Sequence, residues 1–394
     1  MNYKSKDGPF HDFDHLIDRR LSDSLKWGTY EEDVLPMWVA NMDFPAPEAV
    51  IEALRERVDH RVFGYGKKPL ALIETIRDRL LRLYHWEVPF EAITFTPGVV
   101  PGFNLAIRSQ AEDGGELLIQ TPVYPPFLKA AAHSRLSTRT NELKRSEDGP
   151  YEIDFDDFQF ALGPATCAFL LSNPHNPVGR VFRPDELSRM AELCLRNHVV
   201  IVADEIHCDL VFQGHQHTPI ASLGSEIAKR TITLMAPSKT FNIAGLECSF
   251  AVIPDDELRR KFEGARAGMV PGANQLGYVA ALAAYRRADS WHERLLKYLE
   301  TSRDLILEFV ASRLPGISMP SPEGTFLAWL DCRGAGLPGT PASFFLKHAR
   351  VALNDGQRFG PGGEGFVRLN FGCPRSVLQE GLDRMARAME GISR

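Results

Sequence analysis

The sequence predicts an α/β protein with a mostly parallel sheet, and three observations lead to this fold class. Short apolar runs alternate with helix-like segments through the middle of the chain. These runs are apolar at nearly every position, which is typical of strands that are covered by helices on both faces. The residues directly after several runs are rich in Gly, Pro and charged side chains. Because ligands of open α/β sheets bind at the carboxyl ends of the strands, the chemistry is expected in these segments.

The elements of this sheet follow in order along the chain. Five apolar runs are expected to be its strands: "AITFT" (92–96), "ELLIQT" (116–121), "CAFLLS" (167–172), "VVIVAD" (199–204) and "TITLMA" (231–236). A helix is expected over "RPDELSRMAELCLRNH", because its apolar residues recur at helical spacing on one face. Pro184 suits the first turn of this helix, and Asn197 suits its end.

Two domains are predicted from the way the pattern changes. Residues 46–288 form the expected large domain, and residues 1–45 together with 289–394 form a smaller α+β domain. The second part of the smaller domain opens with a long helix from about Trp291 to Leu314. Strand-like "TFLAWLD", a short helix near "PASFFLKHA", strand-like "GFVRLNFG" and a terminal helix follow.

Composition and charge argue against some classes of function. Of the 394 residues, 44% are hydrophobic and 24% are charged, as in ordinary globular proteins. The net charge of −6 and the lack of long basic runs argue against nucleic acid or an anionic membrane as a partner. No apolar stretch is long enough to cross a bilayer. The six cysteines are scattered without a C-x-x-C pair, so we expect no disulfides and a cytoplasmic protein.

Four strand ends together indicate a cofactor site. They read "TPGVVPGFN", "SNPHNPVG", "ADEIHCD" and "APSKTF", and they contain Gly98, Asn176, Asp204 and Lys239. Each residue alone has an ordinary explanation, such as a tight turn, a helix cap or a solvated lysine. Pyridoxal phosphate needs an amine for a Schiff base, a carboxylate for its pyridine nitrogen, a donor to its phenolic oxygen and a cradle for its phosphate. The four strand ends supply these groups, so the sequence predicts a pyridoxal phosphate site.

The motifs also carry a family resemblance. "SNPHNPVG", "ADEIHCD" and "PSKTFNIAG" resemble the fold-type I, class I/II aminotransferases. "SDSLKW", "LPMWVANMDFPAP", "FGYG", "TPGVVPGFNLAI", "TPVYPPF" and "VRLNFGCPR" resemble one branch, the cystathionine β-lyases and cysteine-S-conjugate β-lyases, which includes the maltose-regulon modulator protein. Matching motifs run from Ser22 to Arg375. The resemblance implies the fold-type I transferase architecture and a pyridoxal-phosphate-dependent C–S β-lyase that acts on cystathionine or a related cysteine S-conjugate.

Two other functions remain open at this point. The same residues would serve a class I/II aminotransferase, because both reactions begin with removal of the Cα proton. A regulatory protein that binds a transcription factor and keeps the cofactor site is the second alternative, because the branch includes such behaviour.

The resemblance implies roles for residues around the cofactor ring. Lys239 is expected to bind the cofactor covalently and to move the Cα proton, and Asp204 to pair with the pyridine nitrogen. Asn176 and His207 are expected to serve the phenolic oxygen. Tyr124 is expected to stack on the ring, although ordinary core packing would also explain a tyrosine there.

The resemblance also implies a phosphate site and an active site that two subunits of a dimer share. Gly98, Val99 and Val100 are expected to offer backbone N–H groups to the phosphate at a helix that opens at about Pro101. Ser238 is a further expected phosphate ligand. Tyr65 is expected to reach the phosphate from a neighbouring subunit, which implies a homodimer.

The expected catalytic set is therefore Lys239, Tyr65 and Tyr124. For the amino-acid substrate, Arg368 is expected to bind the α-carboxylate through its planar guanidinium, together with Asn176. Backbone near Val39 and Ala40 is expected to close the other side of the substrate.

A metal site is the alternative to this interpretation. Asp204, His207 and Asp209 form a D-x-x-H-x-D pattern. Residues 204 and 207 of one strand point to opposite faces, which disfavours shared ligation unless the chain turns there. We expect no metal.

Three departures from the family pattern stand out. Glu247 occupies the position of the usual phosphate-binding arginine, and Ala236 that of a usual serine. Asn41 replaces the aspartate that is typical of this motif. The lyase branch commonly lacks the arginine, so its absence favours the lyase over a generic aminotransferase.

Overall fold

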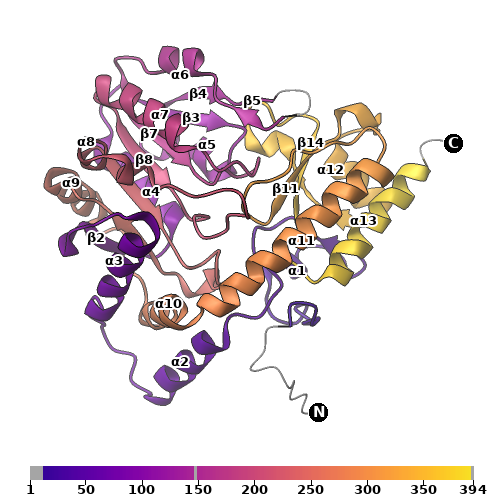
Figure 1. The fold of residues 1–394 in the computed structure, drawn as a ribbon, viewed down its shortest axis with the longest axis horizontal. Coiled ribbons are helices and arrows are strands. Elements are labelled where there is room, and N and C mark those ends of the chain that lie inside the picture. The colour runs from indigo at the N-terminus through magenta and orange to yellow at the C-terminus, as the bar shows by residue number, and fades with distance from the viewer. Residues whose placement is uncertain (1–11, 146–148, 392–394) are drawn as a thin grey trace.

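A seven-stranded sheet lies at the centre of the protein (Figure 1). The structure is a computed structural model that describes residues 12–145 and 149–391. The strands run in the spatial order β2, β10, β9, β8, β7, β3, β4, and only β10 pairs antiparallel with its neighbours. Their bounds are β2 Ile93–Thr96, β3 Glu116–Thr121, β4 Ser137–Glu142, β7 Thr166–Ser172, β8 Val200–Asp204, β9 Thr231–Met235 and β10 Ser249–Val252.

Helices cover both faces of this sheet, which explains why its strands are apolar at successive positions. Leu117 and Ile119 of β3 lie in a buried cluster with side chains of α4, α5 and α9, whereas Leu118 faces a second cluster with α6 and α7. The covering helices are α4 Val99–Gln110, α5 Pro125–His133, α6 Phe155–Ala161, α7 Pro184–Arg196, α8 Ser225–Lys229 and α9 Asp256–Arg266. The sheet and its helices therefore form three layers.

A second group of elements packs beside the first (Figure 1). β14 pairs antiparallel with β11 and β13 to make a small sheet, and β1 pairs in parallel with β12. The strands are β1 Leu35–Pro36, β11 Leu327–Asp331, β12 Val351–Ala352, β13 Asn354–Asp355 and β14 Phe366–Asn370; β5 Lys144–Arg145 and β6 Tyr151–Glu152 form a separate hairpin. The remaining helices are α1 Leu25–Gly28, α2 Glu48–Asp59, α3 Leu70–Tyr84, α10 Gln275–Arg287, α11 Asp289–Arg313, α12 Pro341–Phe344 and α13 Arg375–Glu390.

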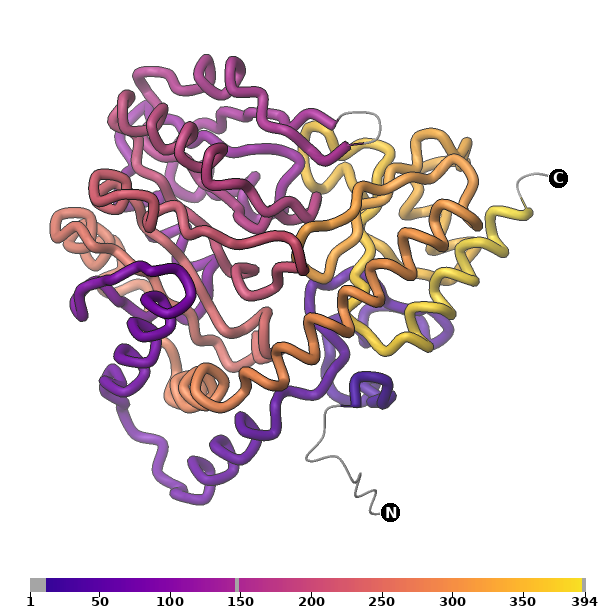
Figure 2. The backbone as a smooth tube through the Cα atoms, viewed as in Figure 1, coloured from indigo at the N-terminus to yellow at the C-terminus, as the bar shows by residue number. Residues whose placement is uncertain are grey.

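The N-terminal part of the chain is fastened to the C-terminal part. Figure 2 shows the indigo segment near residue 35 beside the yellow C-terminal elements, as the β1–β12 pairing requires. A buried ion pair holds the segment that follows: Lys26 Nζ lies 2.6 Å from the Asp43 carboxylate, and their side chains are 1% and 6% exposed. Asp43 also accepts hydrogen bonds from Arg19 and from the Trp27 indole N–H. These contacts fix the residues around position 40 against the rest of the protein.

The structure confirms the predicted fold class and its main elements. All five predicted strands are present, α7 and α11 begin and end within two residues of their predicted bounds, and a terminal helix is present. β4 and β10 were missed, and α4 begins at Val99 rather than near Pro101. The division at residues 45/46 and 288/289 stays a prediction. In the part of the chain that the structure describes, no helix combines the length and the hydropathy that crossing a membrane requires.

Candidate active site

Strand register brings three of the predicted residues to one edge of the sheet. Asp204, the last residue of β8, pairs with Ser172 at the end of β7 and with Leu234 near the end of β9. Asn176 follows β7 and Lys239 follows β9, so both emerge beside Asp204. Parallel strands place their carboxyl ends together, which is why residues far apart in sequence meet here.

Lys239 lies partly buried in the turn after β9. Its Nζ donates a hydrogen bond to the carbonyl oxygen of Ala40 at 2.5 Å. Burial and the nearby charge of Arg368 lower the pKa of Lys239 to about 8, although the Asp204 carboxylate opposes the shift. A lysine with this pKa is partly neutral near physiological pH, and a neutral amine is the form that attacks a carbonyl.

Asp204 is 6% exposed, and its Oδ1 accepts a hydrogen bond from the backbone N–H of Ile206 at 3.1 Å. Burial raises the pKa of Asp204 to about 7, while this hydrogen bond and the charge of Lys239 act in the opposite direction. The carboxylate is therefore placed where a cationic or N–H-bearing partner would stabilise its charged form.

Arg368 on β14 is 4% exposed and is held on three sides. Its Nη1 donates to Asn176 Oδ1 at 3.0 Å, and its Nη2 donates to the Trp38 carbonyl at 2.9 Å and to Asn354 Oδ1 at 2.6 Å. The guanidinium also lies 5.0 Å from the centre of the Phe359 ring. Burial lowers the pKa of Arg368 to about 10, so the side chain stays cationic at neutral pH. Its Nε has no hydrogen-bond partner among the described residues.

Tyr124 stands directly before α5 and joins the cluster through its backbone and its ring. Its N–H donates to the Asn176 carbonyl at 3.0 Å. Burial and the Asp204 carboxylate raise the pKa of Tyr124, and Arg368 opposes the change. The ring also packs against the buried cluster that contains Phe127. Tyr124 therefore lies at the candidate site and also contributes to core packing.

His207 is 3% exposed and lies beside the same cations. Burial, together with the charges of Lys239 and Arg368, lowers the pKa of His207 to about 3, so the ring is neutral. Its Nδ1 is a buried polar atom without a hydrogen-bond partner among the described residues.

The alternative metal cluster is not assembled. Asp209 turns away from Asp204, because its carboxylate accepts hydrogen bonds from Arg79 at 2.5 Å and from Thr240 at 3.1 Å. In residues 12–145 and 149–391, no three His, Cys, Asp or Glu side chains are grouped so as to hold a metal ion.

The start of α4 lies against the middle of the sheet beside β9. Gly102 allows this close approach, because a Cβ there would lie 2.7 Å from a Leu234 methyl carbon. Gly98 caps the helix, and the first-turn N–H groups of Val99 and Val100 have no intrahelical acceptors. Such a turn binds anions. Ser238 lies partly buried in the turn that carries Lys239.

Three predicted residues, Val39, Ala40 and Tyr65, differ in how they relate to this cluster. The segment around Val39 and Ala40 joins it through backbone atoms, as the Ala40 carbonyl shows. Tyr65 does not join it within one chain: it is fully exposed in a stretch, residues 61–69, without helix or strand. Glu247 is exposed, so this position offers no cation to the helix start.

Several contacting residues were missed from sequence. Asn354 lies in a Gly/Pro-rich part of the chain that carries no recognised motif, yet it binds Arg368. Asn242 lies inside the quoted "PSKTFNIAG" motif, but its contacts are with residues 198 and 200 positions away. Asn41 has a buried side-chain oxygen without a partner among the described residues.

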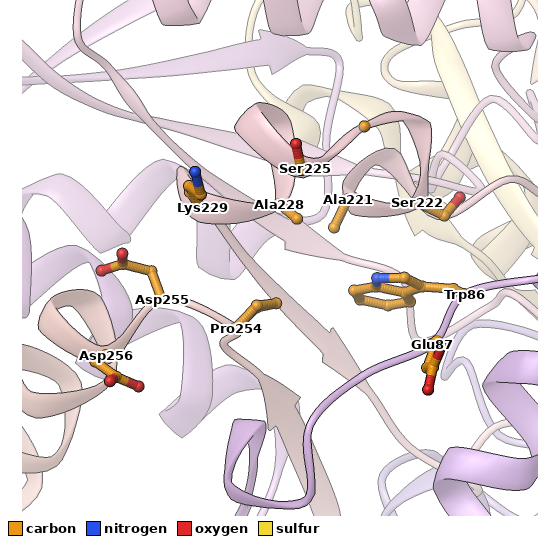
Figure 3. A pocket seen from close by; sticks show the side chains of 11 residues that line it. Trp86, Glu87, Ala221, Ser222, Ser225, Ala228, Lys229, Pro254, Asp255 and Asp256 are labelled. Carbon is orange, nitrogen blue, oxygen red and sulfur yellow. The ribbon is translucent and has the colours of Figure 1, made fainter.

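A separate surface cavity of about 560 Å³ lies elsewhere (Figure 3). Figure 3 shows Trp86 and Glu87 on one side of it and Lys229, Asp255 and Asp256 on the other. None of the predicted site residues lines this cavity. The cluster at the strand ends, with its shifted pKa values and unpartnered buried atoms, is therefore the candidate active site.

Comparisons with known proteins identify the family of the chain. A family model described as aminotransferase class I and II matches residues 32–385. Cystathionine β-lyase PatB of Bacillus subtilis is 41% identical over 386 residues, which is 96% of this chain and 99% of that protein. The crystal structure of OvoB is 45% identical with a TM-score of 0.92, and the match covers 96% of this chain and 99% of that one. Cystalysin from Treponema denticola, whose crystal structure contains a pyridoxal 5′-phosphate cofactor, is 32% identical with a TM-score of 0.93 and covers 97% and 100%.

Proposed function

The chain belongs to the class I and II aminotransferase family, and from that premise we propose that it is a pyridoxal-phosphate-dependent carbon–sulfur β-lyase. It cleaves cystathionine or a related cysteine S-conjugate, with water, to a thiol, pyruvate and ammonia. The observation that carries the proposal is the 41% identity to a cystathionine β-lyase over 96% of the chain. The groups at the strand ends, which suit pyridoxal phosphate, support it.

Pyridoxal phosphate is the cofactor of this family, and the residues present fit it. Lys239 would bind the cofactor covalently, and Asp204 would hold its pyridine nitrogen. The start of α4 would hold the phosphate. The unpartnered Nδ1 of His207, a residue that lies near Lys239 and Arg368, would provide a buried polar atom for the phenolic oxygen, together with Asn176. When bound, the cofactor supplies an aldehyde for the substrate amine and a ring that draws electrons away from Cα.

The protein's own groups would then bind substrate and move its proton. Arg368 binds the α-carboxylate, because its buried guanidinium keeps Nε free while Asn354, Trp38 and Asn176 hold the other nitrogens. Lys239 removes the Cα proton, since a pKa of about 8 leaves part of the amine neutral at the working pH. Tyr124 covers the site from the start of α5 and reduces access of water.

The decisive experiment separates the lyase from the aminotransferase. Purified protein with pyridoxal phosphate is given cystathionine without a keto acid, and pyruvate and thiol are measured. Release of both supports the lyase. If neither is released, while an added keto acid is aminated, the protein is the aminotransferase that the same residues would also serve.

We propose a homodimer in which Tyr65 completes the phosphate site of the partner. Val62, Phe63 and Tyr65 form a run of exposed apolar side chains in the stretch before α3, and such a run is typical of a protein contact. Sedimentation velocity is expected to give twice the chain mass. A fully active monomer would contradict the proposal.

Replacing Tyr65 with phenylalanine tests the shared site. We expect the Kd for pyridoxal phosphate to rise about tenfold, because one hydrogen bond to a charged phosphate is lost. The measurement is a titration of cofactor into cofactor-depleted protein, with Phe160→Ala as a control at another exposed aromatic residue. An unchanged Kd for the Tyr65→Phe variant would remove Tyr65 from the phosphate site.

Replacing Arg368 with lysine tests the carboxylate site. The ammonium cannot keep the bonds to Asn176, Trp38 and Asn354 and also offer a donor where the guanidinium Nε lies. We expect kcat/KM for cystathionine to fall about 10- to 100-fold, mainly through KM, as steady-state pyruvate release would show. Arg358→Lys, in the turn between β13 and β14, is the control. Equal losses in both variants would contradict the assignment.

We place the activity in the cytoplasm. All six cysteines are free, which suits a reducing compartment.

A further inference from the structure

Segment 38–44 runs between the two principal cations of the site. The carbonyl oxygen of Trp38 accepts a hydrogen bond from Arg368, and that of Ala40 accepts one from Lys239 at 2.5 Å. The carbonyls of Val39 and Asn41 accept hydrogen bonds from the Asn370 side chain at the end of β14. The segment therefore presents a row of backbone acceptors, and its position determines where the charged ends of Lys239 and Arg368 lie.

Asn242, three residues after Lys239, clamps the far end of this segment. Its Oδ1 accepts a hydrogen bond from the Met42 N–H at 3.1 Å. Its Nδ2 donates to the carbonyls of Met42 at 3.0 Å and Phe44 at 2.7 Å. One side chain thus uses both ends of its amide on two backbone carbonyls and one N–H.

The backbone conformation of Asn242 also favours these contacts with segment 38–44. Its φ is +54°, in the left-handed region that asparagine tolerates better than other side-chain-bearing residues. This conformation ends the turn that begins at Ser238 and carries Lys239, and it aims the amide back at Met42. Asn242 therefore ties segment 38–44 to the Lys239 turn itself, whereas Asn370 ties the same segment to the strand that carries Arg368.

We propose that Asn242 is a positioning residue that holds the Ala40 carbonyl opposite Lys239 Nζ, so that the carbonyl is the docking point of the amine whenever it is not bonded to the cofactor. The inference rests on the proposed function, because a β-lyase must release this amine and then use it on the Cα proton. A lysine side chain rotates about four bonds, so a fixed acceptor removes orientations from which the amine cannot reach that proton.

The first test uses cofactor-free protein and does not depend on catalysis. Acetic anhydride at trace level, with mass spectrometry of the peptide that carries Lys239, gives the reactivity of this amine as a function of pH. The parent protein is expected to show a midpoint near the pKa of about 8. In Asn242→Gly the midpoint is expected to fall, because a carbonyl acceptor favours the ammonium form and its removal favours the neutral amine.

The second test uses the loaded enzyme and separates positioning from a general loss of structure. In Asn242→Gly we expect kcat to fall about 10- to 100-fold with little change in KM, because the Arg368 contact is held by other residues. The isotope effect of Cα-deuterated substrate is expected to rise, since proton removal becomes more rate-limiting. Asn242→Asp keeps the acceptor for the Met42 N–H but sets a carboxylate oxygen against the Met42 and Phe44 carbonyl oxygens, so its kcat is expected to be no higher than that of Asn242→Gly.

Glycine is the chosen replacement because it adopts a positive φ without strain, so only the amide contacts are lost. His85→Gly is the matched control: His85 has a φ of +52° and lies exposed at the end of α3. It is expected to leave the midpoint, kcat and isotope effect unchanged.

Three results would overturn the inference. They are an unchanged midpoint in Asn242→Gly, a midpoint that rises, which would mean that the clamp only excludes water, and a fall in kcat without any change in the isotope effect. Failure of the β-lyase assay leaves the labelling result readable, so the two proposals fail separately.

Discussion

Replacing Lys239 with alanine is expected to lower the rate of pyruvate release by about 10⁴-fold, because in the proposed function one side chain would both bind the cofactor covalently and move the Cα proton. The residue is placed for this by the end of β9, by the Ala40 carbonyl and by a surrounding that lowers its pKa to about 8. Pyruvate release coupled to lactate dehydrogenase gives the rate.

A second measurement on the same variant tests for the covalent bond between Lys239 and the cofactor. Borohydride reduction of the loaded parent protein is expected to attach the cofactor permanently to Lys239, as peptide mass spectrometry would show, and to leave no label in Lys239→Ala. Lys229→Ala is the control, because Lys229 is an exposed lysine paired with Glu226. A label that persists on another lysine in Lys239→Ala would contradict the assignment of the nucleophile.

Replacing Asp204 with asparagine is expected to move activity and stability in opposite directions. Activity is expected to fall about 10²- to 10³-fold, because the charge that keeps the pyridine nitrogen protonated is removed. Stability of the cofactor-free protein is expected to rise, because a buried carboxylate without a bound partner is costly to ionise. Asparagine keeps the oxygen that accepts the Ile206 N–H.

The effect of Asp204→Asn on stability is expected to depend on pH. The pKa of Asp204 is raised from 3.8 to about 7, so the folded state holds the proton more tightly than the unfolded state. Its contribution to stability is present below about pH 4 and is lost as the pH rises to about 7. The stability gain of Asp204→Asn is therefore expected to grow between about pH 4 and pH 7 and to level off above, at no more than about 4 kcal/mol.

Urea unfolding of the cofactor-free proteins at about pH 5 and pH 8 measures this difference, with Asp78→Asn as an exposed control on α3. Saturating pyridoxal phosphate is expected to reduce the advantage of Asp204→Asn, since the cofactor stabilises the ionised parent residue. A gain that is equal at both pH values would contradict the raised pKa. A variant of full activity would contradict the role of Asp204 in holding the cofactor.

Much of the fold and of the candidate site could be predicted from the sequence because both depend on local signals. Apolar runs such as "VVIVAD" predict β8, and the polar residue that ends a parallel strand predicts the edge where Asp204 lies. Strand β4 was missed for a physical reason: it reads "STRTNE", an edge strand without an apolar run. Strand β10, "SFAV", was also missed, although it is no shorter than the predicted β2.

The contacts that tune the site could not be predicted in the same way. Asn242 meets Met42 across 200 positions, and Asn354 on β13 meets Arg368 as its cross-strand partner on β14. Neither contact leaves a periodic pattern, since hydrogen bonds of this kind depend on where whole elements pack. The pKa values of Lys239 and Asp204 likewise follow from burial, which no single stretch of sequence reveals.

The sequence by itself determined the class of fold and the family, and it predicted the amine, the carboxylate and the guanidinium of the candidate site, because strand ends and local motifs depend on a few neighbouring residues. Only the tertiary structure decided that segment 38–44 lies between Lys239 and Arg368, with Asn242 and Asn370 as its anchors. The reason is physical: orientation and proton affinity depend on which distant groups exclude water and share hydrogen bonds, and these neighbours are chosen when the elements pack together.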